Sequence, residues 1–213
     1  MSAPVVHVVD DDESMRVAVA RLLKAEGFKV RTYASAGDFL LKALEPGPGC
    51  VILDLHMPGP SGLELQQALQ RQPIPLPVVF LTGRGDIASS VRAMKSGAVD
   101  FLTKPVEPAV LMQAVETALL KDRSARADRA SAGEAQARYK RLTERERTVF
   151  QRVVAGKLNK QIADELGIAE RTVKMHRAQV MTKMEAGSLA ELVHVSDLLA
   201  HAGIASQPSA SRG

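Results

Sequence analysis

Short apolar runs rich in β-branched residues alternate with longer amphipathic segments through the first half of the chain. Five of these runs have the length and composition of strands, and the segments between them carry apolar residues at helical spacing. We expect strands at residues 5–9, 29–33, 51–53, 78–81 and 99–102. This alternation predicts an α/β domain, a doubly wound parallel sheet with helices on both faces.

Serine residues mark three of the expected helix starts. Ser14 can cap the first helix, and Ser35 and Ser61 stand at the starts of the second and third. Asp12 and Glu13 are expected to be acids at the N-terminus of this helix, where the helix dipole favours them. Proline and glycine alternate over 46–49 and predict a sharp loop before the third strand.

Polar residues follow four of the expected strands, at the point where each strand ends. Three consecutive acids, 10–12, follow the first strand, and Asp54, Thr82 and Lys104 follow the third, fourth and fifth. Because ligands bind beyond the carboxyl ends of parallel strands, these side chains are expected to converge on one site. Carboxylates, a hydroxyl and a lysine together suit a hard divalent cation and a phosphoryl group. The pattern therefore predicts a phosphorylatable switch.

The second half reads as an all-α domain of four helices. Thr143 and Glu146 form a capping box that begins the first helix, and Asn159 can cap the second. A longer basic helix is expected over 170–184 and a fourth over 189–199. A helix, a turn and a basic helix in this order are typical of a helix-turn-helix.

Residues 121–141 contain many alanine and charged residues but no large aliphatic residue. We expect a charged helical linker that contributes to no hydrophobic core. The end of the chain lacks apolar periodicity and is expected to be disordered. The predicted division is a first domain at 1–121, a linker at 122–141, a helical domain at 142–200 and a tail at 201–213.

Composition and charge narrow the class of protein. Of the 213 residues 46% are hydrophobic, and the single cysteine, Cys50, cannot form an intramolecular disulfide. With no secretory leader or membrane-spanning stretch in view, we expect a cytoplasmic protein with no membrane partner. Residues 1–122 hold 12 basic and 14 acidic residues, whereas 123–213 hold 16 basic and 10 acidic residues. The asymmetry favours a basic half that faces a polyanion, although a solvated surface with uneven charge is the alternative. Because there is no Trp, duplex DNA is favoured over single strands bound by aromatic stacking.

About the first 120 residues resemble the receiver domain of two-component response regulators, a five-stranded flavodoxin-like (CheY-like) fold. The resemblance is carried, in order and spacing, by Asp10, Asp11, Asp54, Thr82, Phe101 and Lys104-Pro105. It implies that Asp54 is the phosphoacceptor and that Lys104 and Thr82 contact the phosphoryl group. It also implies a bound Mg²⁺ or Mn²⁺. Its expected ligands are Asp11, Asp54, the backbone carbonyl of His56 and, through a water, Asp10.

The same resemblance implies a switch around this site. Thr82 and Phe101 would move together on phosphorylation and remodel a dimerisation surface. The residues expected on or near that surface are Ile87, Val91, Met94, Val106 and Leu111. The side chains of His56 and Arg84 would border the phosphoryl group, and Gly62 would help to shape the acceptor loop.

Residues 142–200 resemble the LuxR/NarL/FixJ type of four-helix DNA-binding domain. The motifs are Leu142-Thr143-x-Arg145-Glu146, Asn159-Lys160-x-Ile162-Ala163 and Arg171-Thr172-Val173-Lys174-x-His176. The residues expected near the major groove are Lys174, Met175, Arg177 and Ala178. Those expected at phosphates are Lys160, Arg171, Thr172 and Lys183. A solvated helix face is the alternative for each charged residue, and packing for Met175. Ala169 departs from the family, where a capping serine is usual, so roughly 1 kcal/mol of N-cap stabilisation is lost.

The order of the two domains resembles transcriptional regulators of the FixJ type. The resemblance implies phosphorylation by a sensor histidine kinase, homodimerisation, duplex DNA binding and contact with RNA polymerase. It implies no enzyme beyond metal-dependent self-phosphorylation and slow autodephosphorylation. A phosphatase is one alternative, but it would need an early nucleophile with a second acid two residues on, and it leaves the helix-turn-helix unexplained. A receiver whose helical half binds a protein is the other.

Overall fold

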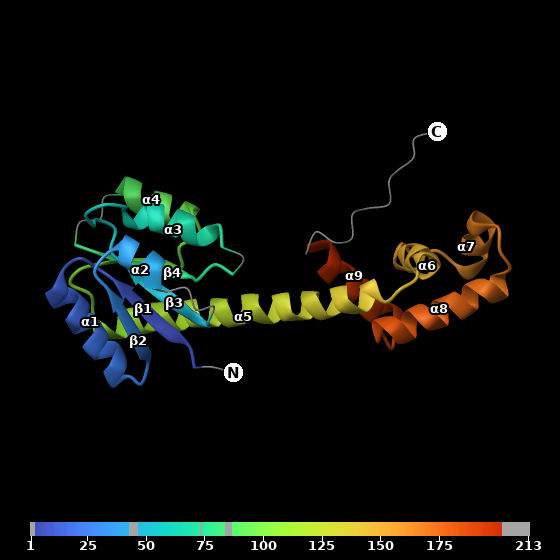
Figure 1. The fold of residues 1–213 in the computed structure, drawn as a ribbon, viewed down its shortest axis with the longest axis horizontal. Coiled ribbons are helices and arrows are strands. Elements are labelled where there is room, and N and C mark those ends of the chain that lie inside the picture. Colours follow the sequence, from blue (N-terminus) through green and yellow to red (C-terminus); the bar gives the residue numbers. More distant parts are fainter. Residues whose placement is uncertain (1–2, 43–46, 73, 84–86, 202–213) are drawn as a thin grey trace. The chain divides into compact units, whose positions relative to one another are not determined.

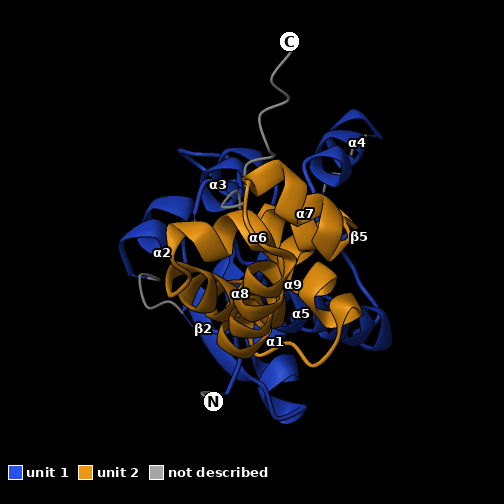
Figure 2. Ribbon diagram, turned by 90° about the vertical axis from the view of Figure 1, so that its right-hand side faces the viewer, with its two compact units in different colours: residues 1–126 blue, residues 127–213 orange. Residues whose placement is uncertain are grey.

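The computed structural model describes residues 3–42, 47–72, 74–83 and 87–201. Arg84 and the expected tail from residue 202 onward lie outside these ranges. The chain divides into two compact units, Met1–Arg126 and Ala127–Gly213, which Figure 2 distinguishes by colour. Within the described ranges, no helix is both long and apolar enough to cross a bilayer.

The first unit contains a parallel sheet of five strands, as predicted. They are β1 (Val5–Val9), β2 (Lys29–Tyr33), β3 (Gly49–Leu53), β4 (Val78–Thr82) and β5 (Asp100–Thr103). The strand order is β2-β1-β3-β4-β5, and every neighbouring pair is parallel. The order reverses its direction between β1 and β3, and such a switch point opens a crevice at the carboxyl ends of the strands. The acids that follow β1 and β3 lie at this switch point.

Helices cover both faces of the sheet (Figure 1). One face is covered by α1 (Glu13–Ala25) and the first part of α5 (Pro108–Lys140). The other is covered by α2 (Ala36–Lys42), α3 (Gly62–Gln70) and α4 (Ile87–Lys95). All five residues of β3 are buried, which explains its continuous apolar sequence, since a central parallel strand is covered on both sides.

The helix starts agree with the serine signals at two of three positions. Ser61 caps α3 in a capping box with Glu64, and the Ser35 hydroxyl accepts from the Asp38 N–H. The assignment of Ser14 as a cap is wrong. Asp12 is the N-cap of α1, because its backbone is extended there and its carboxylate accepts from the N–H groups of Ser14 and Met15.

In the described part of the second unit, four helices and the end of α5 pack around one core. The four helices are α6 (Glu144–Val154), α7 (Asn159–Leu166), α8 (Glu170–Met184) and α9 (Leu189–His201). Thr143 and Glu146 form the predicted capping box at the start of α6. Gly167, in the left-handed region with φ 62°, closes α7 and makes the turn into α8. The helix-turn-helix prediction is therefore confirmed in outline.

Two expectations about this half are wrong. Asn159 does not cap α7, because Leu158 holds the N-cap position and its N–H donates to the Gln161 side chain. Residues of the expected linker do enter a core. Ala135 and Tyr139, near the end of α5, pack in the apolar cluster of the second unit, where the Tyr139 and Phe150 rings lie 5.4 Å apart. A small residue and one aromatic residue are sufficient for this contact, so the absence of large aliphatic residues did not reveal it.

Candidate phosphoacceptor site and DNA interface

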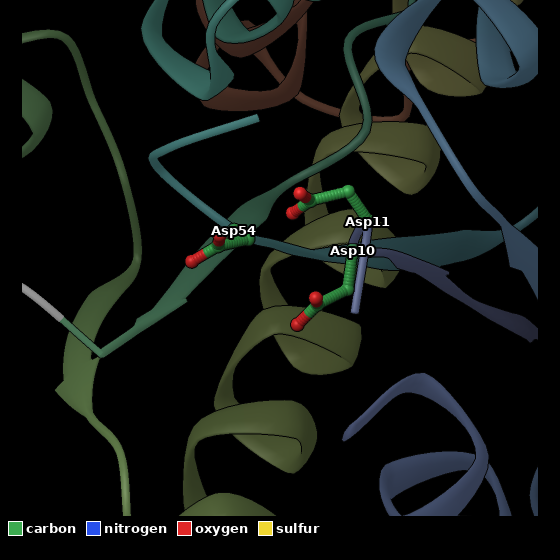
Figure 3. Close-up of side chains that lie close together, drawn as sticks. All are labelled: Asp10, Asp11 and Asp54. Atoms are coloured by element: carbon green, nitrogen blue, oxygen red, sulfur yellow. The ribbon is translucent and has the colours of Figure 1, made fainter. Parts of the chain in front are cut away.

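Three carboxylates meet at the carboxyl end of the sheet (Figure 3). Asp10 and Asp11 follow β1, and Asp54 follows the neighbouring strand β3. One carboxylate oxygen from each lies within 4.8 Å of the others, which is close enough for a shared cation. Asp10 and Asp54 are buried and Asp11 is exposed. Oxygen donors of this kind suit a hard divalent cation such as Mg²⁺, so the residues present fit the ion that the sequence predicts.

Lys104 reaches the same site from the loop after β5. Its ammonium nitrogen lies 2.6 Å from Asp10 Oδ2 and 3.6 Å from Asp54 Oδ1. The bond between Lys104 and Pro105 is cis. The lysine thus forms a hydrogen-bonded ion pair with Asp10 and a longer electrostatic contact with Asp54.

Asp54 carries an incompletely compensated buried charge. Burial raises the pKa of its carboxyl above the ordinary value, and the neighbouring Asp10 adds to the rise. Lys104 opposes this rise in pKa, as do hydrogen bonds from the Leu55 N–H and the Thr82 hydroxyl. Within the described ranges, Asp54 Oδ1 has no hydrogen-bond partner. A carboxylate oxygen in this state is a good acceptor for an incoming cation or phosphoryl group.

Thr82, His56 and Phe101 are the other residues that the sequence predicts near the acids. Thr82, at the end of β4, is 1% exposed, and its hydroxyl lies 3.5 Å from His56 Nδ1. Phe101, on β5, is half-buried, and its ring centroid lies 6.0 Å from that of Phe80 on β4. The structure thus places both members of the predicted switch pair on the two adjacent strands β4 and β5.

Gly62 permits a close approach of α3 to the phosphoacceptor loop. A Cβ at this position would lie 2.3 Å from the Asp54 carbonyl oxygen, a distance that no side chain tolerates. The Gly62 N–H also donates to the Leu55 carbonyl at 3.1 Å. Glycine is therefore required here for the backbone next to Asp54 to pack against the first turn of α3.

Arg16 is the residue near this site that the sequence reasoning missed. It lies on α1, and its guanidinium donates to the backbone carbonyls of Asp10 and Asp11. A basic residue four positions after the acid that caps α1 was the available signal, because that spacing returns the side chain to the helix start.

The residues predicted to contact DNA lie in the second unit, and most of them are on α8. Those that are exposed are Lys160, Arg171, Lys174, Met175 and Ala178. Those that are half-buried are Thr172, Arg177 and Lys183. A groove of about 320 Å³ runs along α8, lined by Met175, Ala178, Gln179, Thr182 and Lys183. Met175 is thus exposed, whereas its neighbour Val173 is fully buried in the core.

Three of these basic side chains also have partners within the described part of the protein, and the first, Lys174, lies 3.6 Å from Glu170 Oε1 on the same helix. Lys183 donates to both oxygens of Glu146, at 2.7 and 2.8 Å, and Arg177 donates to the Asn159 side chain at 3.1 Å. Glu146 is 4% exposed, and the hydrogen bond from Lys183 holds the pKa of its carboxyl below the ordinary value. Lys183 therefore ties the end of α8 to the start of α6, a role that its sequence position did not suggest.

Comparison with known proteins matches both halves of the chain. The family described as the response regulator receiver domain matches residues 6–116, and the luxR family of bacterial regulatory proteins matches residues 140–196. Nodulation protein W of Bradyrhizobium diazoefficiens is 43% identical over 92% of this chain and 86% of its own length. The transcriptional regulatory protein FixJ of Rhizobium meliloti is 45% identical over 90% and 94%.

Solved structures resemble the chain over nearly its whole length. The response regulator StyR matches with a TM-score of 0.78 and 44% identity, covering 92% of this chain and 99% of that one. Full-length FixJ from B. japonicum matches with a TM-score of 0.57 and 40% identity, covering 97% and 100%. The chain therefore belongs to the transcription-regulating response regulators in which a receiver domain is joined to a LuxR-type DNA-binding domain. Membership of this family favours a regulator over a phosphatase, and it indicates a histidine kinase and DNA as partners.

Proposed function

We propose that phosphorylation of Asp54 by a sensor histidine kinase switches this protein to a dimer that binds specific DNA sites. The observation that supports this proposal is the convergence of three carboxylates within 4.8 Å, with the Lys104 ammonium beside two of them. The proposed division is a receiver at 1–121, a linker at 122–141 and a DNA-binding domain at 142–200.

In the proposed reaction Asp54 is the nucleophile. A carboxylate oxygen forms a bond to phosphorus, the bond between phosphorus and the kinase histidine breaks, and its electron pair stays on the histidine nitrogen. Lys104 meets one phosphoryl oxygen and the Thr82 hydroxyl donates to another. The same site would accept a small phosphodonor and would hydrolyse its own acyl phosphate slowly.

The acids are proposed to hold Mg²⁺, which Mn²⁺ can replace. Asp11, Asp54 and the backbone carbonyl of His56 would be direct ligands, and Asp10 would act through a water. The bound ion would neutralise charge on the attacking and transferred oxygens.

Dimerisation is proposed to use the surface near α4. Ile87 is 84% exposed, and Val91 and Met94 are each nearly half exposed, so this helix presents an apolar face to solvent. Val106 is half-buried, whereas Leu111 is fully buried and therefore does not line the surface itself. Thr82 and Phe101 would couple the phosphoryl group to this face.

The DNA-binding role is assigned to α8 and the start of α7. Arg177, Lys174, Met175 and Ala178 are proposed to face the major groove. Phosphate contacts are proposed for Lys160, Arg171, Thr172 and Lys183. We further propose that the protein works in the cytoplasm and contacts RNA polymerase when bound to DNA.

The test is selection of bound fragments from randomised duplex DNA. The samples are the bare protein, the protein with Mg²⁺ and beryllofluoride as a phosphoryl mimic, and Asp54→Asn with the same additions. Glu26→Gln is the matched control, because it removes an exposed carboxylate at the end of α1. We expect a paired motif in the beryllofluoride samples of the wild type and of Glu26→Gln, and none with Asp54→Asn.

Other results separate the alternatives. Equal enrichment in all samples would retain DNA binding but reject control through Asp54. No enrichment in any sample would reject the DNA role and favour a helical half that binds a protein.

A further inference from the structure

Arg16 contacts the backbone carbonyls of all three consecutive acids that follow β1. Its guanidinium donates to the Asp10 carbonyl at 2.6 Å and to the Asp11 carbonyl at 3.4 Å. Its own backbone N–H donates to the Asp12 carbonyl at 2.9 Å. The guanidinium is a rigid planar fork with five N–H donors, so one side chain can hold two neighbouring carbonyls at once.

Asp10 and Asp11 depend on the hydrogen bonds from Arg16 to different extents. Asp10 is held by several other bonds, since its N–H donates to the Tyr33 carbonyl, and its two carboxylate oxygens accept from the Asp12 N–H and from Lys104. Asp11 is exposed, and across the described ranges its carboxylate takes part in no hydrogen bond or ion pair. The Asp11 side chain can change rotamer, but its reach is limited by the position of its backbone, which Arg16 contacts.

The three neighbouring carboxylates repel one another, and a restraint on the Asp11 backbone opposes the effect of this repulsion. The carboxylates of Asp10, Asp11 and Asp54 share a space of 4.8 Å, and their mutual repulsion favours turning the exposed carboxylate outward into water. Asp11 is the only one of the three that is exposed and so has room to turn away. A fixed backbone limits how far it can do so.

We propose that Arg16 is a positioning residue for the cation site. It fixes the backbone of Asp10 to Asp12 so that the Asp11 carboxylate stays beside Asp54 before a divalent cation arrives. This inference rests on the proposed metal-dependent function and adds to it a residue that touches neither the phosphoryl group nor the cation.

A purely electrostatic role for Arg16 predicts the opposite sign. If the guanidinium acted only as a nearby positive charge, its removal would strengthen the binding of a cation. If it positions a ligand, its removal weakens binding, and partners that orient metal ligands typically account for a 10- to 100-fold change in affinity. The direction of the change therefore distinguishes the two roles.

The experiment is a calorimetric titration of Mg²⁺ into the full chain, without any phosphodonor. We expect Arg16→Met to bind Mg²⁺ about tenfold more weakly than the wild type. Arg16→Lys, which keeps the charge and a donor for one carbonyl, is expected to lie between them. Arg21→Met is the control, because Arg21 is exposed on the same helix and its replacement changes the net charge equally.

A second readout reports on the loop itself. In the metal-free protein, we expect the backbone amide resonances of Asp11 and Asp12 to shift in Arg16→Met and to stay in place in Arg21→Met. If Arg16→Met does not fold, Arg16→Lys alone tests the proposal by the same titration and the same two resonances.

The contrary outcomes are distinct. Equal or tighter Mg²⁺ binding by Arg16→Met, or binding by Arg16→Lys that equals the wild type, overturns the positioning role and leaves the proposed function intact. A wild-type protein that binds no Mg²⁺ overturns the proposed metal-dependent function and this inference together.

Discussion

Two buried carboxylates, Asp54 in the first unit and Glu146 in the second, have opposite electrostatic environments. In the first, Asp54 is buried with one oxygen lacking a hydrogen bond within the described ranges, and burial raises the pKa of its carboxyl. In the second, Glu146 is equally buried, but Lys183 and the Thr143 N–H satisfy its carboxylate, and its pKa is lowered. One carboxylate is left ready for a ligand, and the other is fully paired.

This difference determines how each carboxylate responds to a ligand. A site with uncompensated charge gains stability when a cation or phosphoryl group binds, so its conformation responds to that ligand. The Glu146 carboxylate is already paired with Lys183 and the Thr143 N–H, so it has no comparable reason to respond. The comparison therefore distinguishes a carboxylate that can respond to a ligand, Asp54, from one that stabilises the fold, Glu146.

The largest effect is expected from removing the paired carboxylate. Glu146→Ala leaves the Lys183 ammonium and the Thr143 N–H without their acceptor, so the free energy of unfolding of the second unit should fall by about 2–3 kcal/mol through the loss of charge-assisted hydrogen bonds. Urea titration of the full chain, followed by hydrogen exchange of α6 and α8 amides, measures this change. Glu144→Ala, which removes an exposed acid from the same first turn, should change it by only a few tenths of a kcal/mol. A loss below 1 kcal/mol for Glu146→Ala would show that the paired Glu146 carboxylate does not stabilise the second unit.

An intermediate effect of opposite sign is expected at the phosphoacceptor. Asp54→Asn removes an incompletely paired buried charge, so the first unit should be stabilised at neutral pH by about 1–2 kcal/mol. Because the pKa of Asp54 is raised by folding, the wild-type unit loses stability as pH rises from the ordinary aspartate range through the raised pKa. The gain from Asp54→Asn should therefore disappear below the ordinary aspartate pKa. Thermal unfolding across pH, with Glu26→Gln as control, checks this. A destabilised Asp54→Asn at neutral pH would contradict the account of the site.

The smallest effect is expected at the start of the recognition helix. Ala169 is the N-cap of α8, with an extended backbone and no side chain to accept a hydrogen bond. Ala169→Ser should raise the free energy of unfolding of the second unit by about 1 kcal/mol. Ala178→Ser, inside the same helix, should instead lower it slightly, since serine is the weaker helix former. Equal effects of the two substitutions on urea unfolding would show that a capping side chain at position 169 does not stabilise α8.

Much of the fold follows from periodicity and from the residues that end each element. The five strands and the order of helices in both halves are predictable, because apolar spacing directly reflects which faces are buried. The convergence of Asp10, Asp11, Asp54 and Lys104 is predictable too, since parallel strands bring their carboxyl ends to one edge.

Other features depend on details that spacing does not determine. Whether Asp12 or Ser14 caps α1, and whether Leu158 or Asn159 precedes α7, depends on the backbone angles of a single residue. The pairing of Lys183 with Glu146 joins positions 37 apart, which no local pattern reveals. The contacts of Arg16 were also hard to predict, because its partners are backbone carbonyls and its spacing from Asp12 is a weak signal.

The end of α5 has a consequence for how such proteins can be cut and recombined. Ala135 and Tyr139 precede the boundary at residue 142 that the sequence motifs suggest, yet they belong to the apolar cluster around Phe150. A fragment starting at residue 142 would leave part of that cluster bare and prone to aggregate. A chimera that exchanges the first unit for that of another regulator should therefore be joined between residues 127 and 134. A junction there disturbs the packed side chains of neither unit.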